Sequence, residues 1–128
     1  MQTTYKPEGH STVSPYLIVA GADRTIDFLV QVFGAVPGLR VPGPENRVMH
    51  AEVKLDDSVI MLGDAPPDWP VVSAHVHVYV ADVDATYRRA LEYGATSVQE
   101  PVKKGDADKR GGVKDAGGTT WWIGTKME

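Results

Sequence analysis

The sequence predicts an α+β fold of two βαβββ modules that form a curved mixed sheet around a concave pocket. A strand-like apolar run is followed twice by a helical pattern that ends in Gly-Ala, and further strand-like runs follow each time. The two Gly-Ala pairs, at 34–35 and 94–95, lie 60 residues apart, while the strand-like runs align better at 61. Internal repetition of this kind constrains the architecture of the whole chain.

The first module is expected over residues 14–64. Its helix is indicated by apolar side chains at helical spacing, namely Ile26, Leu29, Val30 and Phe33. Gly34 follows the helical pattern, where a left-handed residue commonly ends a helix. Residues 47–64 then read as an alternating strand, an Asp-Asp turn and another strand, and a short strand is expected near 38–42.

The second module, expected over residues 74–125, repeats this order. Its helical pattern again has one apolar face, made by Val83, Tyr87, Ala90 and Leu91. A short strand is expected near 97–100, and the polar, glycine-containing segment 101–115 is expected to be a mobile loop. The polar residues 1–13 are expected to form a flexible N-terminal tail.

Bulk composition excludes several classes of protein. The 128 residues suit one domain, and the absence of cysteine excludes disulfides and thiolate metal sites. Thirteen basic and 17 acidic side chains give a net charge of −4, and the basic residues do not cluster enough to indicate a nucleic-acid partner. The chain has neither an apolar run of membrane-spanning length nor the apolar core of a signal peptide. A cytoplasmic protein without a membrane partner is expected.

Four stretches of the chain resemble the vicinal oxygen chelate superfamily, which contains glyoxalase I, extradiol dioxygenases, and fosfomycin and bleomycin resistance proteins. They are "PYLIVAGADRTIDFLVQVFGA", "RVMHAEVKLDDSVIMLGD", "HVHVYVADVDATYRRALEYGA" and "GGVKDAGGTTWW", and together they cover most of residues 14–125. The resemblance is greatest to the short PhnB-like or glyoxalase-like branch. It implies paired βαβββ modules, a concave sheet and a homodimer.

The same resemblance locates the positions at which metal-using members hold their ion. It places the family's histidine ligand at His75 and its glutamate ligand at Trp122, and moving back 61 residues gives Ser14 and Met61. Of these four, only His75 is a good ligand for a divalent ion, because zinc and iron sites need three or four nitrogen, thiolate or carboxylate donors. The resemblance therefore implies a lost metal site, and no cofactor is expected.

Two histidine-containing pairs leave other interpretations open. His77 shares a strand face with His75, and His50 shares one with Glu52. These pairs would be the material for a rebuilt metal site. Alternatively, His75 and His77 form hydrogen bonds with their neighbours in the sheet, or they contact a ligand directly.

Aromatic residues are expected to replace the metal as the main feature of the pocket. Tyr16 shares its face with Ser14, and Trp122 is expected to point into the trough while Trp121 points into the core. Trp69 lies in a proline-rich loop between the modules that could fold over the pocket mouth. Aromatic walls bind flat or cationic molecules, although most aromatic residues in strands belong to ordinary cores.

The sequence thus favours a metal-independent protein that binds and sequesters an aromatic or cationic small molecule, as bleomycin resistance proteins do without a catalytic metal. The expected ligand-binding residues are Tyr16, Met61, His75, His77, Trp122 and Trp69. The alternative is a lyase, isomerase or dioxygenase of the glyoxalase superfamily. It would use a rebuilt metal site or a metal-free base such as His75 or Glu52. Whether the chain is an enzyme, and which residues would then be catalytic, is left open at this point.

Overall fold

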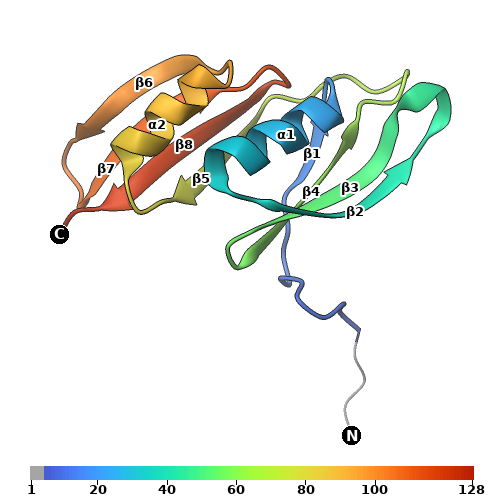
Figure 1. Ribbon diagram of the computed structural model, residues 1–128, viewed down its shortest axis with the longest axis horizontal. Coiled ribbons are helices and arrows are strands. Elements are labelled where there is room, and N and C mark those ends of the chain that lie inside the picture. The colour runs from blue at the N-terminus through green and yellow to red at the C-terminus, as the bar shows by residue number, and fades with distance from the viewer. Residues whose placement is uncertain (1–4) are drawn as a thin grey trace, which may run out of the picture.

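The computed structural model describes residues 5–128 and confirms the predicted α+β fold of two βαβββ modules (Figure 1). Module 1 consists of β1 (Tyr16–Val19), α1 (Ala22–Phe33), β2 (Val36–Pro42), a single 3₁₀ turn (Pro44–Asn46), β3 (Val48–Leu55) and β4 (Ser58–Asp64). Module 2 consists of β5 (Ala74–Tyr79), α2 (Val83–Glu92), β6 (Thr96–Lys103), β7 (Asp108–Lys114) and β8 (Thr119–Lys126).

Each module forms its own open four-stranded sheet, in the order β1-β4-β3-β2 and β5-β8-β7-β6. The first strand of each sheet runs parallel to the last strand of the module, and the other pairs are antiparallel. Parallel pairing of this kind requires a crossover, which the helix and the two following strands supply.

Strand register confirms the internal repeat and locates the one-residue irregularity. Tyr16 pairs with Met61 in module 1, and His77 pairs with Trp122 in module 2, so both members of the second pair lie 61 positions later. Glu52 also pairs with Met61, but the residue that pairs with Trp122 is Gly112, which lies only 60 positions after Glu52. Compared with module 1, module 2 therefore has one residue fewer between its first strand and β7, and one residue more in the β7–β8 turn.

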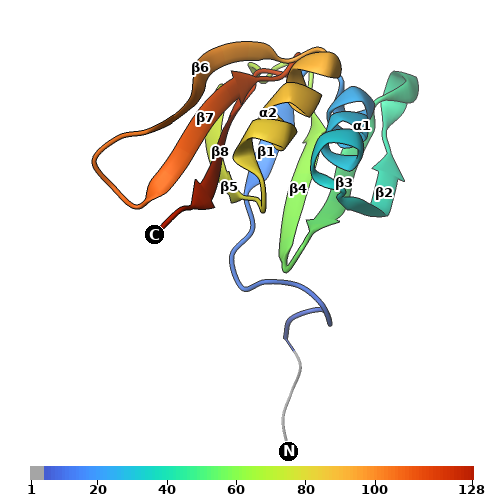
Figure 2. The ribbon, with the colours of Figure 1, turned by 60° about the vertical axis from the view of Figure 1, so that its left-hand side comes forward.

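The two helices cover one face of each sheet, and the core lies beneath them (Figures 1 and 2). Leu29 and Val32 of α1 are fully buried, and Phe33 packs against the equally buried Trp121 of β8 at 5.7 Å between ring centroids. Arg89 of α2 donates from Nε to the Val32 carbonyl at 3.0 Å. These contacts join the two modules through their helix-covered sides, and we call the opposite side of each sheet its open face.

The helices begin in different ways. Helix α1 starts after a left-handed Gly21 without a capping side chain of its own. Asp64 of β4 takes over this role, because its Oδ1 accepts the amides of Gly21 and Ala22 at 3.0 and 2.7 Å. Helix α2 has a local N-cap instead, since Asp82 Oδ1 accepts the Ala85 amide at 3.1 Å.

The predicted loop at 101–115 is wrong for most of its length. Strand β6 continues to Lys103, and β7 already begins at Asp108. The pairs Val102↔Arg110 and Lys103↔Lys109 extend this hairpin past two irregularities in register. Polar side chains are compatible with these positions because β6 is an edge strand and largely exposed.

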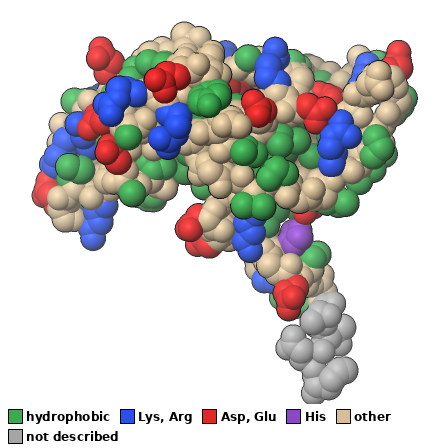
Figure 3. All heavy atoms as spheres, in the orientation of Figure 1, with side chains coloured by type: hydrophobic (Ala, Val, Ile, Leu, Met, Phe, Trp, Pro, Cys, Tyr) green, Lys and Arg blue, Asp and Glu red, His purple; other side chains and the backbone are tan. Residues whose placement is uncertain are grey.

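The N-terminal segment, residues 5–13, lies outside the sheets but contacts module 1. The Lys54 ammonium donates to the Gly9 carbonyl at 2.8 Å. Residues 1–4 lie outside the described residues, and the flexibility expected for 1–13 stays a prediction. On the face seen in Figure 3, acidic and basic side chains are intermingled, without a broad positive patch. Along residues 5–128, neither helix has the length and apolar character needed to cross a bilayer.

Candidate functional site

The open face of module 2 carries an indole and two imidazoles, and the indole contacts one of them directly. Trp122 Nε1 donates a hydrogen bond to His75 Nδ1 at 3.0 Å, and the two ring planes are nearly parallel, with an interplanar angle of 12° and 6.2 Å between centroids. Pairing of β5 with β8 sets His77 beside Trp122. Gly112 makes room for the indole, because a Cβ atom there would lie 2.6 Å from Trp122 Cζ3. His75 therefore lies beside an aromatic ring, and its Nδ1 lone pair already accepts the indole N–H.

A chain of polar groups continues along the same face. Arg110 Nε donates to His77 Nε2 at 3.1 Å, and its Nη2 donates to Asp108 Oδ2 at 2.8 Å. Tyr79 donates its hydroxyl to the same carboxylate oxygen at 2.6 Å. Partial desolvation, and secondly the positive charge of Arg110, lower the pKa of His77 below its usual value. A neutral imidazole is the form that can accept the arginine N–H bond.

The open face of module 1 is built around a carboxylate. Glu52 Oε2 lies 3.0 Å from His50 Nε2, and Oε1 lies 2.7 Å from His10 Nε2. Hydrogen bonds first from His50 and then from His10 lower the pKa of Glu52. The ring of Tyr16 meets that of His50 edge-on at 5.6 Å, and Met61 lies between Tyr16 and Glu52 in the sheet register.

Sequence reasoning found the His50–Glu52 pair but missed His10. Residues 50 and 52 alternate on one strand, so their shared face follows from strand geometry. His10 lies 42 residues before Glu52 in a polar stretch without periodicity. No local pattern indicates that this segment folds back onto β3.

The four positions that the resemblance assigns to metal ligands offer no donor set that fits a metal. His75 faces Trp122, and the hydroxyl of Ser14 lies 3.3 Å from that of Ser11. Met61 offers only a thioether, and an indole coordinates nothing. Across residues 5–128, no group of three or more His, Cys, Asp or Glu side chains is arranged to hold a metal ion. His10 and His50 each contact a different oxygen of Glu52, as hydrogen-bonding partners.

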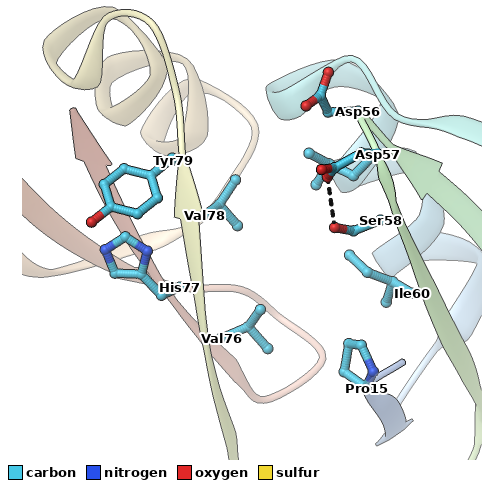
Figure 4. Close-up of a pocket in the computed structure, with 10 residues that line it drawn as sticks. Pro15, Asp56, Asp57, Ser58, Ile60, Val76, His77, Val78 and Tyr79 are labelled. Carbon is cyan, nitrogen blue, oxygen red and sulfur yellow. Dashed lines mark hydrogen bonds between the residues drawn. The ribbon is translucent and has the colours of Figure 1, made fainter. Parts of the chain in front are cut away.

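Two cavities lie close to these residues. One of about 420 Å³ separates β4 from β5, and Figure 4 shows Val76 and Val78 pointing across it toward Ile60. The rings of His77 and Tyr79 point to the other side of β5 (Figure 4). The second cavity, of about 560 Å³, lies between the N-terminal segment and strands β2 and β3.

The predicted ligand-binding residues form two separate groups within one chain. Tyr16 and Met61 lie on the open face of module 1, and His75, His77 and Trp122 on that of module 2. Among the described residues, no hydrogen bond or aromatic contact joins the two groups. Trp69 is 58% exposed in the loop between the modules and lines neither of these two cavities. Their role in ligand binding stays a prediction.

The chain has relatives in mycobacteria. It is 36% identical over 126 residues to an uncharacterized protein of Mycobacterium bovis, an alignment that covers 88% of this chain and 81% of the relative. An uncharacterized protein of Mycobacterium tuberculosis is also 36% identical, with 88% of this chain and 72% of the relative covered.

Solved structures share the fold. TioX from Micromonospora sp. ML1 is 26% identical and superposes with a TM-score of 0.75 over 91% of this chain and 98% of its own. TnmS3, an antibiotic binding protein from Streptomyces sp. CB03234, is 22% identical with a TM-score of 0.68, over 91% of this chain and 99% of its own. The family model of the Glyoxalase/Bleomycin resistance protein/Dioxygenase superfamily matches residues 10–123. With two βαβββ modules and a match over most of its length, the chain belongs to this superfamily.

Proposed function

We propose that the protein binds and sequesters an aromatic or cationic small molecule without a metal ion. The observation that carries the proposal is the pair of His75 and Trp122. At two positions that the resemblance assigns to metal ligands, this chain has an imidazole and an indole with nearly parallel ring planes, joined by a hydrogen bond. Such a surface favours flat rings and cations, at about 0.5–2 kcal/mol for each contact. TnmS3, described as an antibiotic binding protein, has the same fold.

The binding trough is proposed to be completed by a second copy of the chain in a homodimer. Within one chain, the helix-covered sides of the modules meet, while Tyr16 and Tyr79 on the two open faces are 53% and 64% exposed. A second copy that sets its module 1 face against the module 2 face of the first would enclose a ligand between Tyr16 and Met61 on one side and Trp122 on the other. Enclosure of most of the ligand surface is what small-molecule sites require. We place this activity in the cytoplasm.

Tryptophan fluorescence tests the proposal. Planar aromatic compounds should quench the emission of the wild type, and Trp122→Ala should lose this response. Trp69→Phe separates the contributions of the two indoles, because it removes the one that lies in neither open face. Elemental analysis of protein purified without added metal should find no stoichiometric zinc, nickel, iron or manganese. Sedimentation should give a dimer. A tightly held metal, or quenching that survives in Trp122→Ala, would contradict the proposal.

A second candidate function is a metal-free lyase or isomerase, and the His50–Glu52 pair favours it. A carboxylate that accepts from one nitrogen of an imidazole orients the ring and fixes its tautomer, so the other nitrogen of His50 would be the base that removes a proton from a bound substrate. The test is isomerisation of the methylglyoxal–glutathione hemithioacetal in the presence of a chelator. Turnover that persists with chelator and disappears in His50→Gln would favour this candidate over sequestration.

A further inference from the structure

Glu52 is an acidic side chain at the centre of module 1's open face, and its partners are imidazoles. Its side chain is 15% exposed, and each oxygen accepts one histidine N–H bond. Among the described residues, it forms no ion pair with lysine or arginine. Asp108 on module 2 differs, because the guanidinium of Arg110 lies 2.8 Å from it. Module 1 thus carries a carboxylate without a permanent positive charge in contact with it.

A groove opens beside this carboxylate. It is the 560 Å³ cavity between the N-terminal segment and strands β2 and β3, and Glu52 and His10 both line it. Its other walls are largely apolar, with Val36 and Leu39 exposed at 64% and 55%. Lys54 also reaches the groove, but its ammonium is hydrogen-bonded to the Gly9 carbonyl. The groove holds two carboxylates, the exposed Glu8 and the mostly buried Glu52. An apolar groove with acidic groups in its wall fits a molecule with an apolar body and a positive group.

We propose that Glu52 binds the protonated nitrogen of a cationic aromatic ligand, and that His10 occupies this place until the ligand displaces it. The inference rests on the proposed function and deepens it, because it assigns the ligand a positive charge and gives that charge a partner. His10 is the partner that can leave, since it belongs to the N-terminal segment outside the sheets. His50 is fixed on β3 and remains as the second donor that orients the carboxylate.

The physical argument is a competition between two donors for one acceptor. A charged N–H bond to a carboxylate is about twice as strong as a neutral one, so the protonated nitrogen of a ligand can take the place of His10 on Glu52 Oε1. A protein molecule in which His10 is bonded to Glu52 cannot bind the ligand there. The apparent affinity for the ligand is therefore reduced in proportion to the fraction of protein molecules in that state. The lowered pKa of Glu52 supports the proposal, because it keeps the carboxylate ionised in neutral solution.

Calorimetric titration at neutral pH with two planar dyes tests the charge requirement. Proflavine is a cation, and acridine is the same ring system without the amino groups and without the charge. The wild type should bind proflavine at least about tenfold more tightly, a factor that corresponds to about 1.4 kcal/mol. Glu52→Gln should remove this preference and leave acridine binding within about twofold. Glu92→Gln is the matched control, because it removes the same charge from an exposed position on α2 that lines neither cavity.

The His10→Ala variant tests the competition. It should bind proflavine about threefold more tightly than the wild type does, with acridine unchanged, because the internal partner of Glu52 is gone. Equal binding of both dyes by the wild type, or equal losses in Glu52→Gln and Glu92→Gln, would overturn the inference while the proposed function stands. Weaker proflavine binding by His10→Ala would also overturn it. Failure of the wild type to bind either dye would count against both proposals.

Discussion

The open faces of the two modules share a backbone but differ in chemistry. At equivalent positions, module 1 has Glu52 beside Met61, and module 2 has Gly112 beside Trp122. In module 1, two side chains of medium size share the space above the sheet. In module 2, the Trp122 indole fills that space alone, because Gly112 has no side chain. The comparison teaches that a repeated sheet can preserve its packing and still present a carboxylate on one side and an aromatic surface on the other.

The helix-covered faces also carry different side chains at equivalent positions. Substitutions there are expected to change the free energy of unfolding most. Trp121 and its module 1 equivalent Ile60 are both buried, but only Trp121 also holds a polar group, since its Nε1 donates to Asp115 Oδ2 at 2.7 Å. Trp121→Ala should lower the free energy of unfolding by about 4 kcal/mol, and Ile60→Ala by about 2 kcal/mol. Urea denaturation of both variants provides the measurement. Equal losses in the two variants would contradict this expectation.

The two helix starts give the next prediction. Asp64→Ala should cost about 2–3 kcal/mol, because it leaves the amides of Gly21 and Ala22 without an acceptor and also removes the bond from the Val48 amide. Asp82→Ala removes one local cap and should cost about 1 kcal/mol. Thermal unfolding of the two variants measures the difference. A greater loss in Asp82→Ala would show that the long-range cap is the weaker of the two.

The bare backbone beneath Trp122 can be tested by adding a single methyl group. In Gly112→Ala the new Cβ would collide with the indole, so the ring should turn away from His75 at a cost of about 1–2 kcal/mol. The indole N–H resonance of Trp122 reports the loss of its hydrogen bond. Gly38→Ala in module 1 is the control, because its Cβ would meet only an ordinary contact of 3.5 Å with the Glu52 carbonyl. An unchanged Trp122 resonance in Gly112→Ala would contradict the steric argument.

The smallest effects are expected from pH, in a separate window for each open face. Folding lowers the pKa of His77, so the unfolded chain binds more protons and stability falls as the pH drops below about 6.5. The pKa of Glu52 is also lowered, but its contribution is lost only as the pH drops below about 4.5 and through the folded value. Unfolding measured against pH should flatten in the upper window for His77→Gln and in the lower window for Glu52→Gln. If His77→Gln instead altered the lower pH window and Glu52→Gln the upper one, the assignment of each window to its residue would be wrong.

The repeat, the fold class and the opposite orientations of Trp121 and Trp122 could be predicted because they depend on strand and helix periods. The bonds from Trp122 to His75 and from Arg110 to His77 could not, since they depend on side-chain conformations across neighbouring strands. The polar composition of residues 101–115 led to the prediction of a loop. The segment instead forms most of a hairpin at the sheet edge, where charged residues are tolerated. The separation of the two open faces follows from how the helices pack against one another, which no local pattern encodes.

The β3–β4 and β7–β8 turns suggest how such a duplicated chain can diversify. The first has two residues between paired strand ends, Asp56 and Asp57, and the second has three, from Ala116 to Gly118. Because the extra residue is absorbed at a hairpin tip, the ladders on either side keep equivalent rungs. A side chain of one module can therefore be introduced at the equivalent position of the other module, which the strand register identifies. Chimeras that carry two carboxylate faces or two indole faces become a practical route to new ligand preferences.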